Sequence, residues 1–297
     1  MAVYVNTNVS SLNGRRYLNN VQNQLTTTYQ RLSSGMRINS AKDDAAGLQI
    51  ADRLTTQING LNQGNRNTND GIALAQTIEG ALDETSSMLQ KIRTLAVQSA
   101  NGTNTQSDRD ALNAEAQSLV DEIGRIATQT KFGGKTVLNG ATTADTIYGT
   151  QANGTKGGTL TLQVGANKGD EINFTVANFS MFSKFGGNIN TAAYKAGKIT
   201  LNTVAGAKEV ISLMDTLISK VDGQRSGLGA IQNRLESSIR NQSNVAANQS
   251  DARSRIRDAD FAEESANLSQ QSIIQQAATS MLMQANSRPQ LALSMLG

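Results

Sequence analysis

Apolar residues recur at helical spacing through both ends of the chain. Near the N-terminus they fall at Leu18, Val21, Leu25 and Leu32, with Thr28 in phase, in alternating steps of three and four. This spacing is typical of a helix that packs against another in coiled-coil fashion. The segment 33–35, Ser-Ser-Gly, predicts its end, because glycine often follows the last helical residue.

A longer helical pattern extends from Ser40 to Ala100. Ser40 and Asp43 fit an N-terminal cap, in which a side-chain oxygen accepts a free backbone N–H. After Asn101-Gly102, the segment 107–110 opens another helix with apolar residues at helical spacing up to Ile126. The short connection predicts an antiparallel pair of helices.

The centre of the chain has a different period. Residues 160–164 and 171–176 alternate apolar and polar side chains, and a polar segment with two glycines separates them. This pattern predicts a β-hairpin with an extended turn. Phe179, Phe182 and Phe185 follow, and we expect them to cover the apolar face of the hairpin.

The second half returns to helical spacing and mirrors the first. Apolar positions follow a near-heptad track from Val210 to Ile256, and nothing from Ala230 to Arg288 breaks a helix. Pro289, the only proline, is expected to end it. The seam residues expected in this tail are Leu268, Ile274, Ala278, Met281 and Leu282. The whole pattern predicts a mainly α fold, with long antiparallel coiled-coil-like helices from both chain ends and a small central β-hairpin.

Five glycines interrupt the long helix of the first half, namely Gly47, Gly60, Gly64, Gly71 and Gly80. Each costs a helix about 1 kcal/mol relative to alanine. Extensive packing must offset that cost, and we expect small residues here to let neighbouring helices approach closely.

Composition excludes much chemistry. The 297 residues contain no cysteine and no histidine, so thiolate, disulfide and imidazole chemistry is impossible. We expect no catalytic site, metal or cofactor. The net charge is +3. Arg253, Arg255 and Arg257 lie close to Asp251, Asp258 and Asp260, which favours ion pairs within a helix over a nucleic-acid surface. No apolar stretch of about 20 residues suggests a membrane span.

The two chain ends are almost free of charge. Residues 1–30 carry only Arg15 and Arg16, and residues 265–297 carry only Arg288. A helix that is apolar on one face and nearly neutral elsewhere needs a partner surface. The ends therefore predict a subunit that assembles.

These segments also resemble those of bacterial flagellins. The stretch 31–50, RLSSGMRINSAKDDAAGLQI, looks like the hallmark N-terminal motif of that family. Residues 95–115, 162–172 and 254–286 look like its further helical, hairpin and C-terminal stretches. The resemblance covers about residues 1–180 and 200–297.

The resemblance implies a domain organisation. Residues 1–40 and 258–297 would form an inner helical domain from the paired termini. Residues 41–180 and 200–257 would form a helical shell with the hairpin near 160–176, and 181–199 would be a short connection without a large outer domain. The implied function is a subunit of the bacterial flagellar filament, used in swimming motility.

Partners and localisation follow from the same resemblance. Family members are exported by the flagellar type III apparatus, held by a chaperone at the C-terminal helix, and polymerise with themselves beneath a cap protein and next to hook-junction proteins. The filament is extracellular. The resemblance also implies contact with Toll-like receptor 5 through Lys91, Leu95 and Glu115, where receptor-active relatives usually carry Arg at the first position. The alternative is that all three pack against neighbouring subunits, and we favour this as their primary role. No nucleic-acid or membrane partner is expected.

Three other hypotheses stay open from the sequence. A hook–filament junction protein shares the terminal patterns but forms only a thin ring. A secreted enzyme with a catalytic insert would need more residues in the centre, which also lacks histidine for a zinc site. A cytoplasmic helical scaffold would fit the coiled-coil composition.

Overall fold

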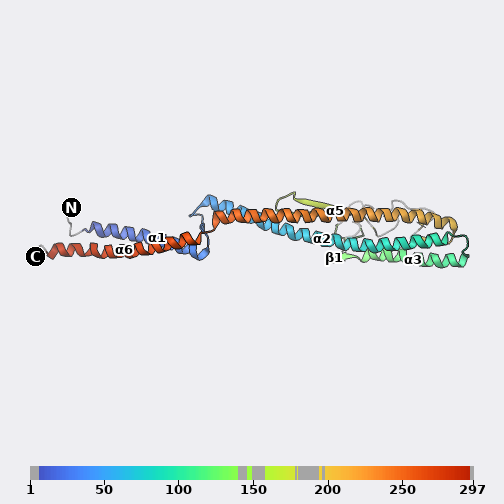
Figure 1. Cartoon of the computed structure of the whole chain (residues 1–297), viewed down its shortest axis with the longest axis horizontal. Helices are drawn as coiled ribbons and strands as arrows, with labels where there is room; N and C mark the ends of the chain where they lie inside the picture. The colour runs from blue at the N-terminus through green and yellow to red at the C-terminus, as the bar shows by residue number, and fades with distance from the viewer. Residues whose placement is uncertain are drawn as a thin grey trace. The chain divides into compact units, whose positions relative to one another are not determined.

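The computed structural model describes residues 7–139, 146–148, 158–177, 179, 194–195 and 198–294. The fold is mainly helical (Figure 1), with helices α1 (Val9–Ser34), α2 (Ala45–Ser99), α3 (Gln106–Gln129), α5 (Val204–Arg257) and α6 (Phe261–Ser294). Antiparallel pairs join β1 (Lys131–Phe132) to β2 (Lys135–Thr136), β3 (Gly158–Gln163) to β4 (Glu171–Val176), and β5 (Tyr194–Lys195) to β6 (Lys198–Ile199). The predicted fold class is confirmed.

The chain forms two compact units. Residues 1–58 and 246–297 make up the terminal unit, and residues 59–245 make up the middle unit. The boundaries expected from the resemblance, at 40 and 258, stay a prediction. Most of the expected connection at 181–199 lies outside the described residues.

Helices α2, α3 and α5 lie side by side in the middle unit and enclose its core (Figure 1). Ile78 and Ile92 of α2 and Met214 of α5 are completely buried there. Where the helices meet at the surface, Arg93 donates to Asp215 at 2.6 Å. The helix predicted between Ser40 and Ala100 therefore contributes apolar side chains to the core of the middle unit.

The α2–α3 turn is fixed by polar groups. Thr105 caps α3, and its hydroxyl and backbone exchange hydrogen bonds with Asp108 in a reciprocal capping box. Arg109 is 9% exposed and donates to the carbonyls of Asn101 and Asn104, both at 3.1 Å. The antiparallel helical pair predicted from the short connection is confirmed.

The central hairpin packs one face against the core. Leu160 pairs with Phe174 and Leu162 with Ile172, while the side chains of β4 alternate between exposed and buried. Phe179 is also buried. Phe182 and Phe185 lie outside the described residues, so their expected place over the hairpin stays a prediction.

Glycines of α2 mark where this hairpin touches the helix. A Cβ on Gly60 would lie 2.6 Å from the Cβ of Ala166, and one on Gly64 would overlap the carbonyl of Val164. A Cβ on Gly71 would meet the side chain of Leu162. Close approach was predicted correctly. The hairpin lies closest to these glycines, and the neighbouring helix α5 also reaches Gly64 and Gly71 through Gln242 and Leu235.

The other two glycines of α2 differ. A Cβ on Gly47 would meet Asp44 and Ile38, whereas Gly80 faces open space. The α2 N-terminus also differs from the prediction. The helix begins at Ala45, and the carboxylate of Asp44, not Ser40, accepts from the amide of Gly47 at 2.9 Å.

The prediction of an unbroken helix from Ala230 to Arg288 is wrong at one point. Residues 258–260 separate α5 from α6. Met36 pairs with Asp258 as an antiparallel bridge, and Ala259 donates to the carbonyl of Gly35 at 3.0 Å. Asp260 then caps α6 by accepting from the amide of Ala262 at 2.8 Å.

Pro289 was expected to end α6, and this prediction is wrong. The helix continues to Ser294. Proline inside a helix removes the hydrogen bond that its own N–H would give to the carbonyl four residues earlier, and its ring crowds that carbonyl. That carbonyl, on Ala285, accepts instead from the side chain of Asn8 at 2.7 Å.

Candidate polymerisation surface

Helices α1 and α6 form the antiparallel pair of the terminal unit (Figure 1). Asn8 bonds to Ala285 at 2.7 Å near one end of the pair. The Thr28 hydroxyl donates to Gln271 at 3.2 Å further along. Near the other end, Arg31 pairs with Glu264 at 3.1 Å. These polar links were not predicted, although Thr28 was expected in phase with the seam.

The predicted seam lies along this pair but is not dry. Val21 and Ala278 are buried, at 4% and 7% exposure. Met281 is 71% exposed. The remaining predicted seam residues are half-buried, namely Leu18, Leu25, Leu32, Leu268, Ile274 and Leu282. Two helices alone cannot enclose this apolar stripe, because each covers only one side of the other.

Large exposed apolar side chains gather in the terminal unit. Of the ten among the described residues, nine lie there and only Val97 lies in the middle unit. Ile273 and Met283 are 66% and 68% exposed. The others are Val9, Leu12, Tyr17, Tyr29, Ile50, Phe261 and Met281. An apolar surface of this kind marks an interaction site.

A groove of about 1080 Å³ lies between α1 and α6. Asn13, Gly14 and Tyr17 line it from α1, and Ile274 and Met281 line it from α6. Its walls combine apolar side chains with neutral amides and hydroxyls, and Arg16 is the one charged side chain among them. The neutral groups are buried at low cost, because a neutral polar group loses far less hydration energy than a charge does.

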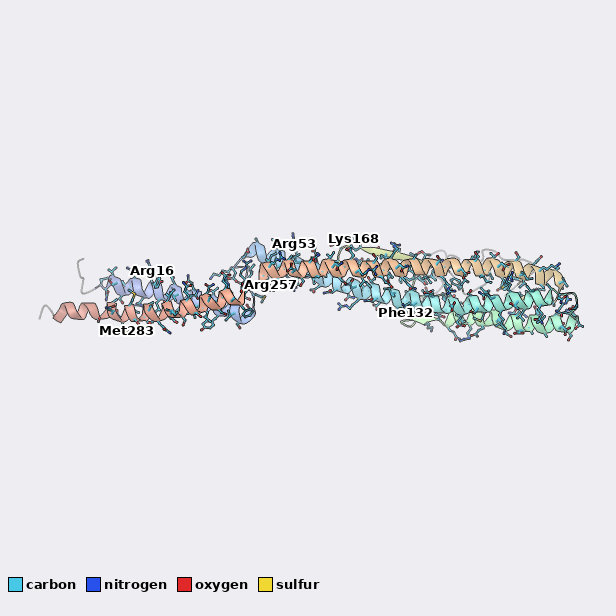
Figure 2. All side chains as sticks on the ribbon, in the orientation of Figure 1. Arg16, Arg53, Phe132, Lys168, Arg257 and Met283 are labelled. Carbon is cyan, nitrogen blue, oxygen red and sulfur yellow. The ribbon has the colours of Figure 1, made fainter. Side chains whose placement is uncertain are left out.

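Charge is sparse around this groove. In residues 9–30 and 265–287, Arg15 and Arg16 are the only charged side chains, and both are exposed. Figure 2 labels Arg16 on α1 and Met283 on α6. The neutral ends noted in the sequence therefore lie on one helical pair.

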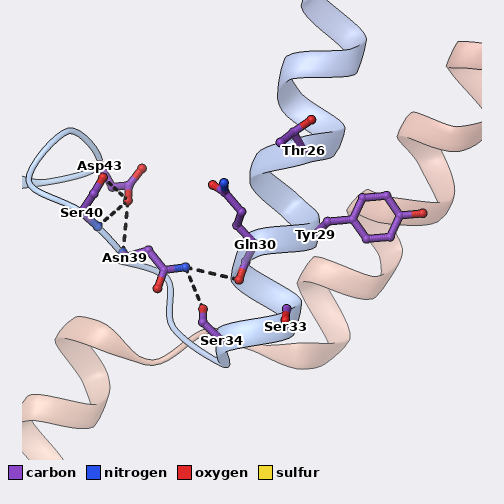
Figure 3. Close-up of a pocket in the computed structure, with 8 residues that line it drawn as sticks. All are labelled: Thr26, Tyr29, Gln30, Ser33, Ser34, Asn39, Ser40 and Asp43. Atoms are coloured by element: carbon purple, nitrogen blue, oxygen red, sulfur yellow. Dashed lines mark hydrogen bonds between the residues drawn. The ribbon is translucent and has the colours of Figure 1, made fainter.

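The motif at 31–50 builds the turn between α1 and α2 (Figure 3). Gly35 ends α1 at a φ of 69°, a conformation that favours glycine. The carboxylate of Asp43 accepts from the amides of Asn39 and Ser40 at 3.1 and 2.9 Å. The hydrogen bonds from Ser40 come first among the causes that lower the pKa of Asp43 below 3.8.

Side chains from this turn also line a cleft of about 740 Å³. Asn39 donates there to the Ser34 hydroxyl at 2.7 Å and to the Gln30 carbonyl at 3.3 Å (Figure 3). These polar groups bond to one another and hold the turn. The motif is therefore a structural element of the terminal unit.

The expected receptor residues lie in the middle unit. Lys91 of α2 and Glu115 of α3 form an ion pair at 3.0 Å, with side chains 58% and 48% exposed. Leu95 is only 7% exposed and belongs to the core. The structure thus brings the two charged residues together and places the leucine beneath the surface.

The described residues contain no group of three or more acidic side chains placed to hold a metal ion. No helix among them has a long enough apolar stretch to cross a membrane. The ion pair expected near the end of α5 is present, as Arg255 contacts Asp251 at 2.8 Å.

Comparison with known proteins identifies the family. Residues 5–143 match the bacterial flagellin N-terminal helical region, and residues 211–296 match the C-terminal helical region. Polar flagellin C of Vibrio parahaemolyticus is 37% identical over 383 aligned positions that cover all of both chains. Flagellin A of Vibrio cholerae is 38% identical over 378 positions, again covering both chains fully.

Two solved structures are also similar. A putative flagellar hook-associated protein from Vibrio parahaemolyticus has a TM-score of 0.58 at 18% identity, covering 73% of this chain and 100% of that one. Bacillus cereus flagellin has a TM-score of 0.48 at 30% identity, covering 60% and 88%. Flagellins are structural proteins, not enzymes, and they form the extracellular filament of the flagellum. The chain belongs to the bacterial flagellin family and is a structural subunit of the flagellar filament.

Proposed function

We propose that this chain polymerises by burying the surface of its terminal unit between copies, with α1 and α6 as the main contact. The observation that carries this proposal is the distribution of large exposed apolar side chains, nine of ten of which belong to the terminal unit. The seam residues expected from the sequence contribute on the same pair, and Met281 does so from the edge of the groove.

The hydrophobic effect gives the size of the contribution. Full burial of one aliphatic side chain is worth about 2 kcal/mol. Ile273 is 66% exposed in the single chain, so most of that energy remains to be gained on assembly. A substitution that removes this contribution should raise the critical concentration for polymerisation about 30-fold.

The test compares two exposed β-branched apolar residues on helix surfaces, Ile273 and Val97. Ile273→Gln should raise the critical concentration and leave the helicity of the monomer unchanged. Val97→Gln is the control, because Val97 is 49% exposed but lies in the middle unit. If the two substitutions weaken polymerisation equally, the terminal unit is not the main contact.

Electron microscopy separates the filament from the hook–filament junction. Purified protein should form long filaments, and deletion of residues 265–297 should abolish them while the middle unit stays folded. A chain that forms no filament under any condition would support the junction hypothesis. A truncated chain that still forms normal filaments would overturn the proposed surface.

We also propose that the chain is exported by the flagellar type III apparatus and that a chaperone covers α6 before export. Ile273, Met281 and Met283 support this proposal, because their exposure would let free chains associate inside the cell. Pull-down from cells before secretion should recover a small partner bound to full-length chain. The same partner should be absent with the chain shortened by residues 265–297.

A receptor contact at Lys91 and Glu115 is the second proposal from the resemblance. The exposed ion pair between α2 and α3 supports it. The planar guanidinium of arginine binds carboxylates in two places at once, whereas lysine offers a point charge. Lys91→Arg should therefore strengthen activation of cells that carry Toll-like receptor 5, and an unchanged response would remove Lys91 from the contact.

A further inference from the structure

The interior of α6 contains a proline. Pro289 lies five residues before the last helical residue, Ser294. A helical residue normally donates its N–H to the carbonyl four positions earlier, and proline has no N–H to donate. The carbonyl of Ala285 is therefore left without its partner from within α6.

Asn8 supplies the missing donor from the other end of the chain. Its side-chain Nδ2 donates to the Ala285 carbonyl at 2.7 Å. Its Oδ1 accepts from the amide of Ser11 at 3.0 Å and so caps α1. The side-chain amide of Asn8 thus uses both its nitrogen and its oxygen. Only this orientation of the amide satisfies both the Ala285 carbonyl and the Ser11 amide.

This bond lies beside the groove of the terminal unit. Ala285 is one of the residues that line the groove, and Gly14 lines it from α1. A Cβ on Gly14 would lie 3.1 Å from Cδ1 of Leu282, so the helices approach closely just inside the Asn8–Ala285 bond. The next described hydrogen bond along the pair, from Thr28 to Gln271, is far from this end.

We propose that Asn8 is a positioning residue for polymerisation. Its amide replaces the hydrogen-bond donor that Pro289 removes from α6, and the bond fixes the register of α1 against α6 in which the groove receives a second copy of the chain. This inference rests on the proposed function, because it concerns the same surface.

Asn8→Asp is the critical substitution. Aspartate still caps α1, and its charge favours a helix N-terminus, so α1 itself is not weakened. It cannot donate to the Ala285 carbonyl. We expect the critical concentration of the full chain to rise about tenfold, as for loss of a hydrogen bond that leaves a carbonyl unpaired.

Pro289→Ala supplies the rescue. Alanine at 289 restores the backbone N–H, so Ala285 no longer needs Asn8. In that background Asn8→Asp should change the critical concentration by less than about twofold. Asn19→Asp is the matched control, because Asn19 is exposed on α1 and gains the same charge away from Ala285.

A second measurement reads the register in the dilute monomer. The chain has no cysteine, so Gly14→Cys with Leu282→Cys introduces a unique pair. The Cβ expected at residue 14 lies 4.0 Å from that of Leu282, within the range for a disulfide. The intramolecular disulfide should form several-fold more slowly with Asn8→Asp, and Pro289→Ala should restore its rate.

The outcomes distinguish the two proposals. If the unsubstituted chain forms no filaments, the proposed function fails, while the disulfide rates still test Asn8. If Asn8→Asp has no effect on either measurement, or the same effect with proline and with alanine at 289, Asn8 does not replace the missing donor and the inference is overturned.

Discussion

Gly64→Ala tests why α2 carries glycine in its interior. The residue lies where the turn of the β3–β4 hairpin reaches the helix. An added Cβ would overlap the carbonyl oxygen of Val164 and lie 2.7 Å from its carbonyl carbon. It would also approach Oε1 of Gln242 at 3.2 Å. The obstacle is backbone, which cannot rotate away as a flexible side chain can.

Two opposing effects set the size of the change. Overpacking that displaces backbone costs about 3 kcal/mol at the upper end of its usual range. Alanine recovers about 1 kcal/mol of helix propensity over glycine. The net expectation is a loss of about 2 kcal/mol in the free energy of unfolding.

Gly80→Ala is the control on the same helix. Nothing lies within 4 Å of the Cβ that it would add, so only helix propensity changes. The free energy of unfolding should rise by about 1 kcal/mol. Urea denaturation of the monomer, followed by circular dichroism, measures both variants. Shifts of the same sign and size would refute the claim that the hairpin requires Gly64.

Helix caps and ion pairs also contribute stability that single substitutions should remove. Thr105→Ala should cost about 1 kcal/mol in urea denaturation, because the capping box with Asp108 is lost. The hydrogen bonds that lower the pKa of Asp43 stabilise the α1–α2 turn at pH values above 3.8, the ordinary pKa of this side chain. That stability is lost as the pH falls below 3.8. Thermal unfolding of Asp43→Asn should therefore depend less on pH between about 4 and 2. Glu264→Gln should loosen the terminal pair by about 1 kcal/mol, since Arg31 is one-third exposed and keeps some hydration. Faster amide exchange in α1 would reveal this change, and unchanged exchange would contradict it.

Sequence patterns correctly predicted the helices and strands whose formation depends on neighbouring residues. The spacing of Leu18, Val21 and Leu25 correctly indicated α1, and Gly35 correctly marked its end. The period-two segments at 160–164 and 171–176 correctly indicated the hairpin. In each case the signal is contained within a few neighbouring residues, so no distant contact was needed to interpret it.

Contacts between distant residues decided the rest. The bridge between Met36 and Asp258 at the break before α6 joins residues too far apart in the sequence for a local pattern to indicate it. Asp260 and Glu263 do have capping-box spacing, and this signal could have located the new helix start. The effect of Pro289 was predicted wrongly for the same reason. The donor that Pro289 lacks is replaced at the Ala285 carbonyl by the side chain of Asn8, which is far away in the sequence.

The candidate surface was predictable in outline. Charge-free ends indicated α1 and α6, and the seam residues lie along this pair of helices. That the pair is the polymerisation surface stays a prediction. The sequence did not indicate that most of the seam would remain half-buried, since that depends on how many helices surround it. Nor did it indicate the Arg31–Glu264 link, because the two residues lie far apart in the sequence.

Methionine oxidation shows whether the exposed surface of the terminal unit is buried between copies of the chain. Met281 is 71% exposed at the groove, whereas Met214 is fully buried in the middle unit. Peroxide should oxidise Met281 rapidly in the monomer and slowly in the filament, and Met214 should react slowly in both. Equal reactivity of Met281 before and after polymerisation, read by mass spectrometry, would contradict burial of this surface between copies.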